Sequence, residues 1–69
     1  MRQQPSLTEI QRRYIDTVNR VEPRYRALVR STAERRALRD LRAWGFSAEQ
    51  AYQLIDDARA IEVLERMAR

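Results

Sequence analysis

The sequence contains no cysteine, no histidine and no lysine, and it has only one glycine and two prolines in 69 residues. Without cysteine or histidine the chain lacks disulfides, the usual zinc ligands and the common catalytic bases and nucleophiles. A single glycine also excludes a glycine-rich phosphate-binding loop. We therefore predict that the protein is not an enzyme and that it uses no cofactor, no metal ion and no small-molecule substrate.

Long apolar runs are also missing. The longest is Ala27–Val29, far short of the roughly 20 residues that a membrane-spanning helix needs. The first residues, Met1–Pro5, lack the apolar stretch of a signal peptide. We expect a cytoplasmic chain that spans no membrane, with a flexible tail over residues 1–5 and one helical domain over residues 6–69.

The composition that remains favours helix almost everywhere, because alanine, leucine, arginine, glutamate and glutamine are abundant. At three places a serine stands three residues before a glutamate or glutamine, the spacing of an N-terminal capping box. These serines are Ser6, Ser31 and Ser47. Gly45 lies just before the last of them, where it is expected to end the preceding helix.

The apolar spacing from Leu7 to Thr32 keeps one helical phase across Pro23. This phase favours one long helix over about residues 7–30, kinked at Pro23 because proline has no amide hydrogen to donate. Two helices joined near Glu22 are the alternative, since an interior proline costs about 3 kcal/mol. A helical hairpin over about residues 32–44 and 48–68 follows, so the predicted fold class is an all-α three-helix assembly.

The last predicted helix carries acidic residues as well as apolar ones. Asp56 and Asp57 are adjacent, and Glu62 and Glu65 follow one turn apart. Neighbouring positions on a helix point about 100° apart, and oxygen cages for hard cations usually come from loops. We therefore interpret these carboxylates as a solvated acidic face.

All fourteen basic residues are arginine, against ten acidic residues, for a formal net charge of +4. Residues 1–42 hold eleven of the arginines and five acids, whereas residues 43–69 hold three arginines and five acids. On the first predicted helix the arginines flank the apolar stripe, with Arg13 and Arg20 on one side and Arg12 and Arg30 on the other.

One cationic face lies on the second predicted helix and consists of Arg35, Arg36, Arg39 and Arg42. The planar guanidinium fork suits phosphate oxygens, so this face is the candidate phosphate-binding site of a nucleic-acid-binding module. Two other interpretations are a solvated face that reflects a genome-wide preference for arginine over lysine, and ion pairs with another protein.

The corner Trp44-Gly45-Phe46 places two aromatic residues around the only glycine. The stretch Leu41–Phe46, together with the later Ile61-Glu62 pair, resembles the ubiquitin-associated domain family, which has a Leu-x-x-Met-Gly-Phe corner and a Val-Glu pair opening its third helix. The resemblance implies a compact three-helix module with Trp44 and Phe46 on an apolar protein-binding surface. The alternative is that these aromatics are core residues that hold the helical hairpin together.

A helix over residues 7–30 extends about 36 Å, beyond the roughly 20 Å that a helix over residues 32–44 can cover. Part of its stripe is then expected to need a partner, either another protein or a second copy. The leading hypothesis is a non-enzymatic protein–protein interaction module: self-associating, or a small subunit, adaptor or inhibitor of a larger protein. Its expected contact residues are Leu7, Ile10, Tyr14, Val18, Arg13 and Arg20.

Overall fold

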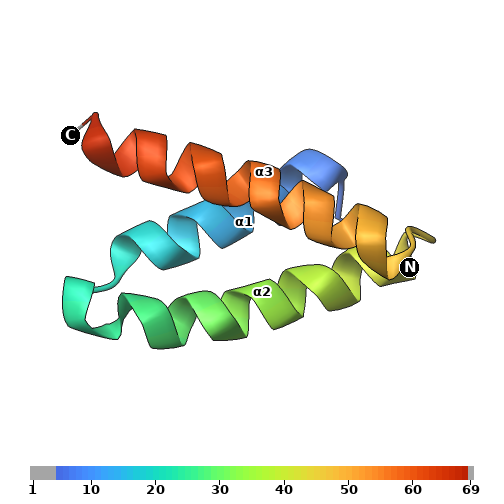
Figure 1. The fold of residues 1–69 in the computed structure, drawn as a ribbon, viewed down its shortest axis with the longest axis horizontal. Coiled ribbons are helices and arrows are strands. Elements are labelled where there is room, and N and C mark those ends of the chain that lie inside the picture. Colours follow the sequence, from blue (N-terminus) through green and yellow to red (C-terminus); the bar gives the residue numbers. More distant parts are fainter. Residues whose placement is uncertain (1–4, 69) are drawn as a thin grey trace.

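The structure, a computed structural model, describes residues 5–68 and contains three helices in that range. Helix α1 (Leu7–Arg20) leads through a short 3-10 turn, η1 (Pro23–Tyr25), into α2 (Arg26–Ala43), and α3 (Ala48–Met67) follows. Figure 1 shows α1 and α2 as a hairpin that α3 crosses. Each helix packs against the other two, so the prediction of an all-α three-helix assembly is confirmed.

Pro23 separates two helices instead of kinking one. Helix α1 ends at Arg20, and Val21 and Glu22 are extended. The ring of a proline disfavours helical backbone at the residue before it, whereas its missing amide hydrogen costs nothing at the first position of a helical turn. The alternative of two helices joined near Glu22 is therefore confirmed, and a continuous helix over residues 7–30 is wrong.

Helix α2 runs through Ser31, where the capping pattern predicted a new helix beginning near residue 32. Pro23 and η1 already start the chain helically, so the helix reaches Ser31 without needing a second cap. The Thr32 hydroxyl donates to the Leu28 carbonyl at 3.4 Å, as a threonine inside a helix does. The second helix thus begins at Arg26, earlier than the sequence pattern suggested.

The other two predicted caps are present. The Ser6 hydroxyl accepts a hydrogen bond from the Glu9 amide at 3.1 Å and begins α1. Ser47 and Gln50 form a complete capping box, with the Ser47 hydroxyl accepting from the Gln50 amide and the Gln50 side chain accepting from the Ser47 amide. Both helix starts are therefore determined locally.

The α2–α3 corner depends on the only glycine. Gly45 has a φ of +101°, a conformation that residues with a Cβ atom rarely adopt. The Gly45 amide donates to the Arg42 carbonyl, and the Phe46 amide donates to the Leu41 carbonyl, which is the Schellman arrangement. Phe46 also packs against the core cluster that contains Leu41, so this side chain is an anchor of the corner.

The core consists of two clusters that share the three helices. One contains Ile10, Ala37, Leu41, Ala51 and Ile55. The other contains Tyr14, Ile15, Val18, Ala33 and Ala58.

The core accounts for much of the surface that was expected to bind a partner. Ile10, Tyr14 and Val18 are at most 3% exposed, and Leu7 packs at the core edge. The expectation of an uncovered stripe was wrong because α1 has 14 residues and α2 has 18, so α2 is long enough to cover α1. A partner is therefore not needed to cover an overhanging end of the first helix.

Helix α3 is continuous through Asp56 and Asp57. The ubiquitin-associated resemblance implied a separate helix opening at Ile61-Glu62, and within residues 5–68 no helix begins there. Its buried line consists of Ala51, Ile55, Ala58 and Glu62. The apolar residues of its second half, by contrast, are largely exposed. Within residues 5–68, no helix is long and apolar enough to cross a membrane.

Candidate interaction groove

The arginines of this protein lie in two contrasting environments, and the first faces α3. Arg12 of α1 forms two parallel hydrogen bonds with the Glu65 carboxylate, at 2.6 and 2.8 Å, and a third with Asp16 at 3.2 Å. Arg59 of α3 pairs with Glu34 of α2. Each of these arginines therefore meets a carboxylate of the same protein.

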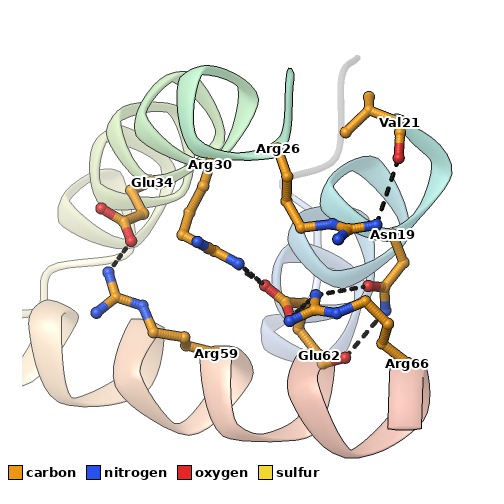
Figure 2. Close-up of polar contacts among 8 residues, drawn as sticks. All are labelled: Asn19, Val21, Arg26, Arg30, Glu34, Arg59, Glu62 and Arg66. Atoms are coloured by element: carbon orange, nitrogen blue, oxygen red, sulfur yellow. Dashed lines mark hydrogen bonds and ion pairs between the residues drawn. The ribbon is translucent and has the colours of Figure 1, made fainter. Parts of the chain in front are cut away.

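Glu62 is the centre of this environment and is fully buried. Figure 2 shows its carboxylate between Arg30 of α2 and Arg66 of α3. Arg30 donates to Glu62 Oε1 at 2.8 Å, and Arg66 donates to Oε2. Asn19 of α1 donates to the Glu62 backbone carbonyl at 3.2 Å and accepts from Arg66. All three helices thus meet at one carboxylate. We call the pairs of Arg12, Arg30, Arg59 and Arg66 with their glutamates the arginine–glutamate interface.

The electrostatics of the interface are those of a structural ion-pair network. Hydrogen bonding to Glu62 raises the pKa of Arg30, and hydrogen bonding to Glu65 raises the pKa of Arg12, in both cases against the opposing effect of desolvation. A raised arginine pKa contributes stability at every pH below the ordinary arginine value, and this contribution is lost only as the pH rises through the raised value. The Arg12 and Arg30 guanidinium groups therefore stay charged across the physiological range.

A buried carboxylate among cations is a candidate catalytic group in general, but Glu62 offers no access to a substrate. Its side chain is 0% exposed and both carboxylate oxygens are bonded to arginines. The interpretation of Glu62 as part of a solvated acidic face was therefore wrong. The sequence did contain a sign that Glu62 is buried. Glu62 continues the helical spacing of the buried residues Ala51, Ile55 and Ala58.

The second environment is a groove between α1 and α2, on the side of the hairpin where no described residue of α3 contributes. It encloses about 260 Å³. Its α1 wall consists of Ile10, Arg13, Tyr14 and Thr17. Its α2 wall consists of Leu28, Val29, Thr32, Ala33, Arg36, Ala37 and Asp40. The groove exists because α2 presents small alanines beside α1, where larger side chains would fill the space.

The groove is apolar along its length and cationic on its rims. Leu28 is 72% exposed at one end, a large uncovered apolar surface for a single side chain. Arg13 and Arg36 stand on opposite walls. Both are exposed, and neither side chain forms a hydrogen bond or ion pair with another described residue. The only carboxylate in the lining is Asp40, which lies 3.8 Å from Arg39.

The same lack of a partner holds for Arg20 on α1 and Arg35 on α2, both exposed and without a hydrogen bond or ion pair within residues 5–68. The flanks assigned from the sequence agree with this division for Arg13 and Arg20, but not for Arg24, which the apolar phase places on the same flank and which pairs with Glu22. Arg13 and Arg36 line the groove, which has no described α3 residue in its lining, whereas Arg12 and Arg30 pair with glutamates of α3.

Of the residues predicted to contact a partner, Ile10, Arg13 and Tyr14 line the groove. Leu7, Val18 and Arg20 do not. The sequence pattern did not predict that residues of α2 line a groove with α1: Leu28 was not among the expected contact residues, and Arg36 was assigned only to the cationic face. Which α1 residues face Leu28 and Arg36 depends on how α2 packs back along α1. The spacing of apolar residues within one helix does not predict this packing.

The predicted cationic face is exposed at all four positions, Arg35, Arg36, Arg39 and Arg42. Only Arg36 lines the groove, and Arg42 donates to the Phe46 carbonyl at 3.0 Å. At the corner, Trp44 is 41% exposed, and its indole nitrogen donates to the Pro5 carbonyl at 2.7 Å. The core interpretation therefore fits Phe46, while Trp44 keeps part of its surface open.

No protein-family model, curated protein or solved structure gives a significant match to this chain. Among the described residues, no group of three or more acidic side chains is placed to hold a metal ion.

Proposed function

We propose that this protein is a non-enzymatic protein–protein interaction module, whose α1–α2 groove binds an acidic amphipathic helix. The observation that carries the proposal is the distribution of pairing. The arginines that face α3 have carboxylate partners within the chain, whereas Arg13 and Arg36 at the groove have none among residues 5–68. The missing counter-charges are those that a partner would supply.

The occupant follows from the shape and chemistry of the groove. An apolar groove between two helices suits the apolar stripe of a third helix. Arginines on both walls favour carboxylates on the two flanks of that stripe, and they disfavour a basic segment by repulsion. Leu28 at the groove end supplies an apolar contact that is now exposed to water.

The test is titration of the protein with a synthetic amphipathic helix that has leucines spaced by three and four residues and glutamates on both flanks. We expect saturable binding that weakens as salt is raised, because the rim charges are screened. A matched peptide with glutamines in place of the glutamates is expected to bind at least about tenfold more weakly, a difference of about 1.4 kcal/mol.

Two variants locate the binding surface. Arg36→Gln is expected to weaken binding of the acidic peptide about tenfold. The control Arg35→Gln removes the same charge from the neighbouring position, which does not line the groove, and is expected to have a much smaller effect. Equal losses for the two variants would show that the peptide senses only net charge, and the groove proposal would then be wrong.

A second candidate function, nucleic-acid binding, is favoured by the exposed face of Arg35, Arg36, Arg39 and Arg42. It predicts retention on an oligonucleotide at about 50 mM salt and loss at about 200 mM, since phosphate contacts release counterions. The double variant Arg35→Glu/Arg39→Glu should then abolish retention. The apolar lining between Arg13 and Arg36 favours the helix-binding proposal, because phosphate contacts do not require an exposed leucine such as Leu28.

A further inference from the structure

The side of α3 that faces away from the core is itself an acidic amphipathic surface. The second half of α3 exposes three large apolar side chains, of which Leu64 and Met67 lie opposite the buried line. The three are Ile61, Leu64 and Met67, at 40%, 65% and 75% exposure. Contiguous exposed apolar side chains on one helix are typical of an interaction surface.

Acidic residues precede this apolar patch on the same side of the helix. Asp56 and Asp57 are exposed, and neither forms an ion pair with another described residue; Asp57 accepts a hydrogen bond only from Gln53, at 3.4 Å. Adjacent residues on a helix point about 100° apart, so the two carboxylates lie on the two flanks of the line that continues through Ala60 and Leu64. We call Asp56, Asp57, Ala60, Leu64 and Met67 the outer face of α3.

We propose that the outer face of α3 from a second copy of this chain occupies the α1–α2 groove. This inference rests on the proposed function of the groove and names its partner. The occupant has the required chemistry: carboxylates on both flanks, the small Ala60 between them, and Leu64 about one turn beyond. The carboxylates without ion-pair partners on one copy complement Arg13 and Arg36 on the other.

The spacing of the two surfaces agrees with this arrangement. On α2, Arg36 and Leu28 are eight residues apart, or about 12 Å along the helix. On α3, Asp57 and Leu64 are seven residues apart, or about 10.5 Å. With α3 antiparallel to the α2 of its neighbour, one pair of ends brings opposite charges together and the other brings two exposed leucines together.

The contact joins two different surfaces, so it is head-to-tail. The groove has no described α3 residue in its lining, and the outer face of α3 points away from the core. One copy can therefore donate α3 to a neighbour while its own groove receives another. Such heterologous contacts produce chains or closed rings that grow with concentration.

The decisive experiment is complementation between two disabled variants, followed by light-scattering mass. Leu28→Asp is expected to stop the groove from binding and to leave the outer face of α3 intact. Leu64→Asp is expected to stop the outer face from binding and to leave the groove intact. We expect mass growth with concentration for the unchanged chain, monomers for each variant alone, and a 1:1 heterodimer when the two are mixed. Both leucines are exposed, and circular dichroism verifies that the helices remain.

The mixture separates the possible arrangements. If Leu64→Asp alone still self-associates, the contact is groove to groove and the inference is wrong. If Leu28→Asp alone still self-associates, the contact joins two α3 helices, which also overturns it. The control Tyr52→Asp, at a 56% exposed position on the same helix but outside the outer face, is expected to behave like the unchanged chain.

Charge exchange provides an independent test. Arg36→Asp and Asp57→Arg should each weaken self-association at least about tenfold, and the double variant Arg36→Asp/Asp57→Arg should restore it, because every contact then carries the reversed pair. A monomeric unchanged chain that still binds the acidic synthetic peptide would contradict only this inference. A chain that binds neither the peptide nor itself would contradict the proposed function as well.

Discussion

Both sides of the α1–α2 hairpin carry arginines, but among the described residues only the side toward α3 supplies them with carboxylate partners from another helix. Toward α3, Arg30 meets the buried Glu62 and Arg12 meets Glu65. On the groove side, Arg13 and Arg36 are exposed without a partner among the described residues. The comparison shows that arginine content alone does not indicate function, because its meaning depends on whether the same chain supplies the counter-charge. Paired arginines are expected to stabilise the fold, and unpaired ones to recognise a partner.

The largest effect expected on the paired side comes from Glu62→Gln. The change keeps the shape of the side chain and leaves Arg30 and Arg66 without a counter-charge. Removing one partner of a buried ion pair costs about 3–5 kcal/mol of folding stability. Because Arg30 and Arg66 are partly exposed, we expect a loss of about 3 kcal/mol for Glu62→Gln. Thermal unfolding should then begin roughly 15 °C earlier for a domain of this size.

The matched control is Glu34→Gln, which loses a pair with Arg59 in which both side chains are partly exposed. Its cost should stay below about 1 kcal/mol. Similar losses of stability for Glu62→Gln and Glu34→Gln would show that burial at Glu62 does not matter.

A smaller loss is expected for Arg12→Gln. Its two-bond pairing with Glu65 is well formed, but the Arg12 side chain is 45% exposed, so solvent screens the attraction. We expect a destabilisation of about 0.5–1 kcal/mol that shrinks as salt is added. Chemical denaturation at low and high salt measures it, and a loss independent of salt would point to packing by the side chain instead.

On the groove side, Leu28→Ser should change the free energy of unfolding by no more than about 0.5 kcal/mol, because the leucine is mostly exposed. The same variant should lose most of its affinity for the acidic peptide. Denaturation and peptide titration on one sample make the comparison direct. A strong loss of stability with intact binding would invert the roles assigned to the two sides.

The smallest effect on stability is expected for Arg36→Gln. Removing an unpaired positive charge from a basic hairpin relieves repulsion, so stability should be unchanged or raised by a few tenths of a kcal/mol. Peptide binding should nevertheless fall. Destabilisation comparable to that of Arg12→Gln would mean that Arg36 has a partner within the chain in solution.

Local patterns in the sequence predicted the features that depend on neighbouring residues. The Ser6 and Ser47 caps and the Gly45 corner were predicted correctly because their hydrogen bonds span only a few residues. The Ser31 cap was wrong for the same reason: the pattern matched, but Pro23 had already started α2 upstream. A capping pattern is therefore informative only where the chain is not already helical.

The candidate site was predicted only in part. Arg13 was recognised beside an apolar stripe, but the stripe itself became core once α2 covered α1. Leu28 belongs to the apolar spacing from Leu7 to Thr32, yet the structure exposes this side chain at the groove. The helical period gives the angle of a residue around its own helix, not the side from which a neighbour approaches.

By itself, the sequence determined the helical class, the helix-starting caps at Ser6 and Ser47, and the corner at Gly45, because propensity and capping act over one helical turn. The tertiary structure alone decided which arginines are paired. Arg12 and Glu65 are 53 residues apart in the sequence, and Arg30 and Glu62 are 32 apart. Such pairs form only when packing sets the crossing and register of whole helices, and the same packing leaves the groove and the outer face of α3 uncovered.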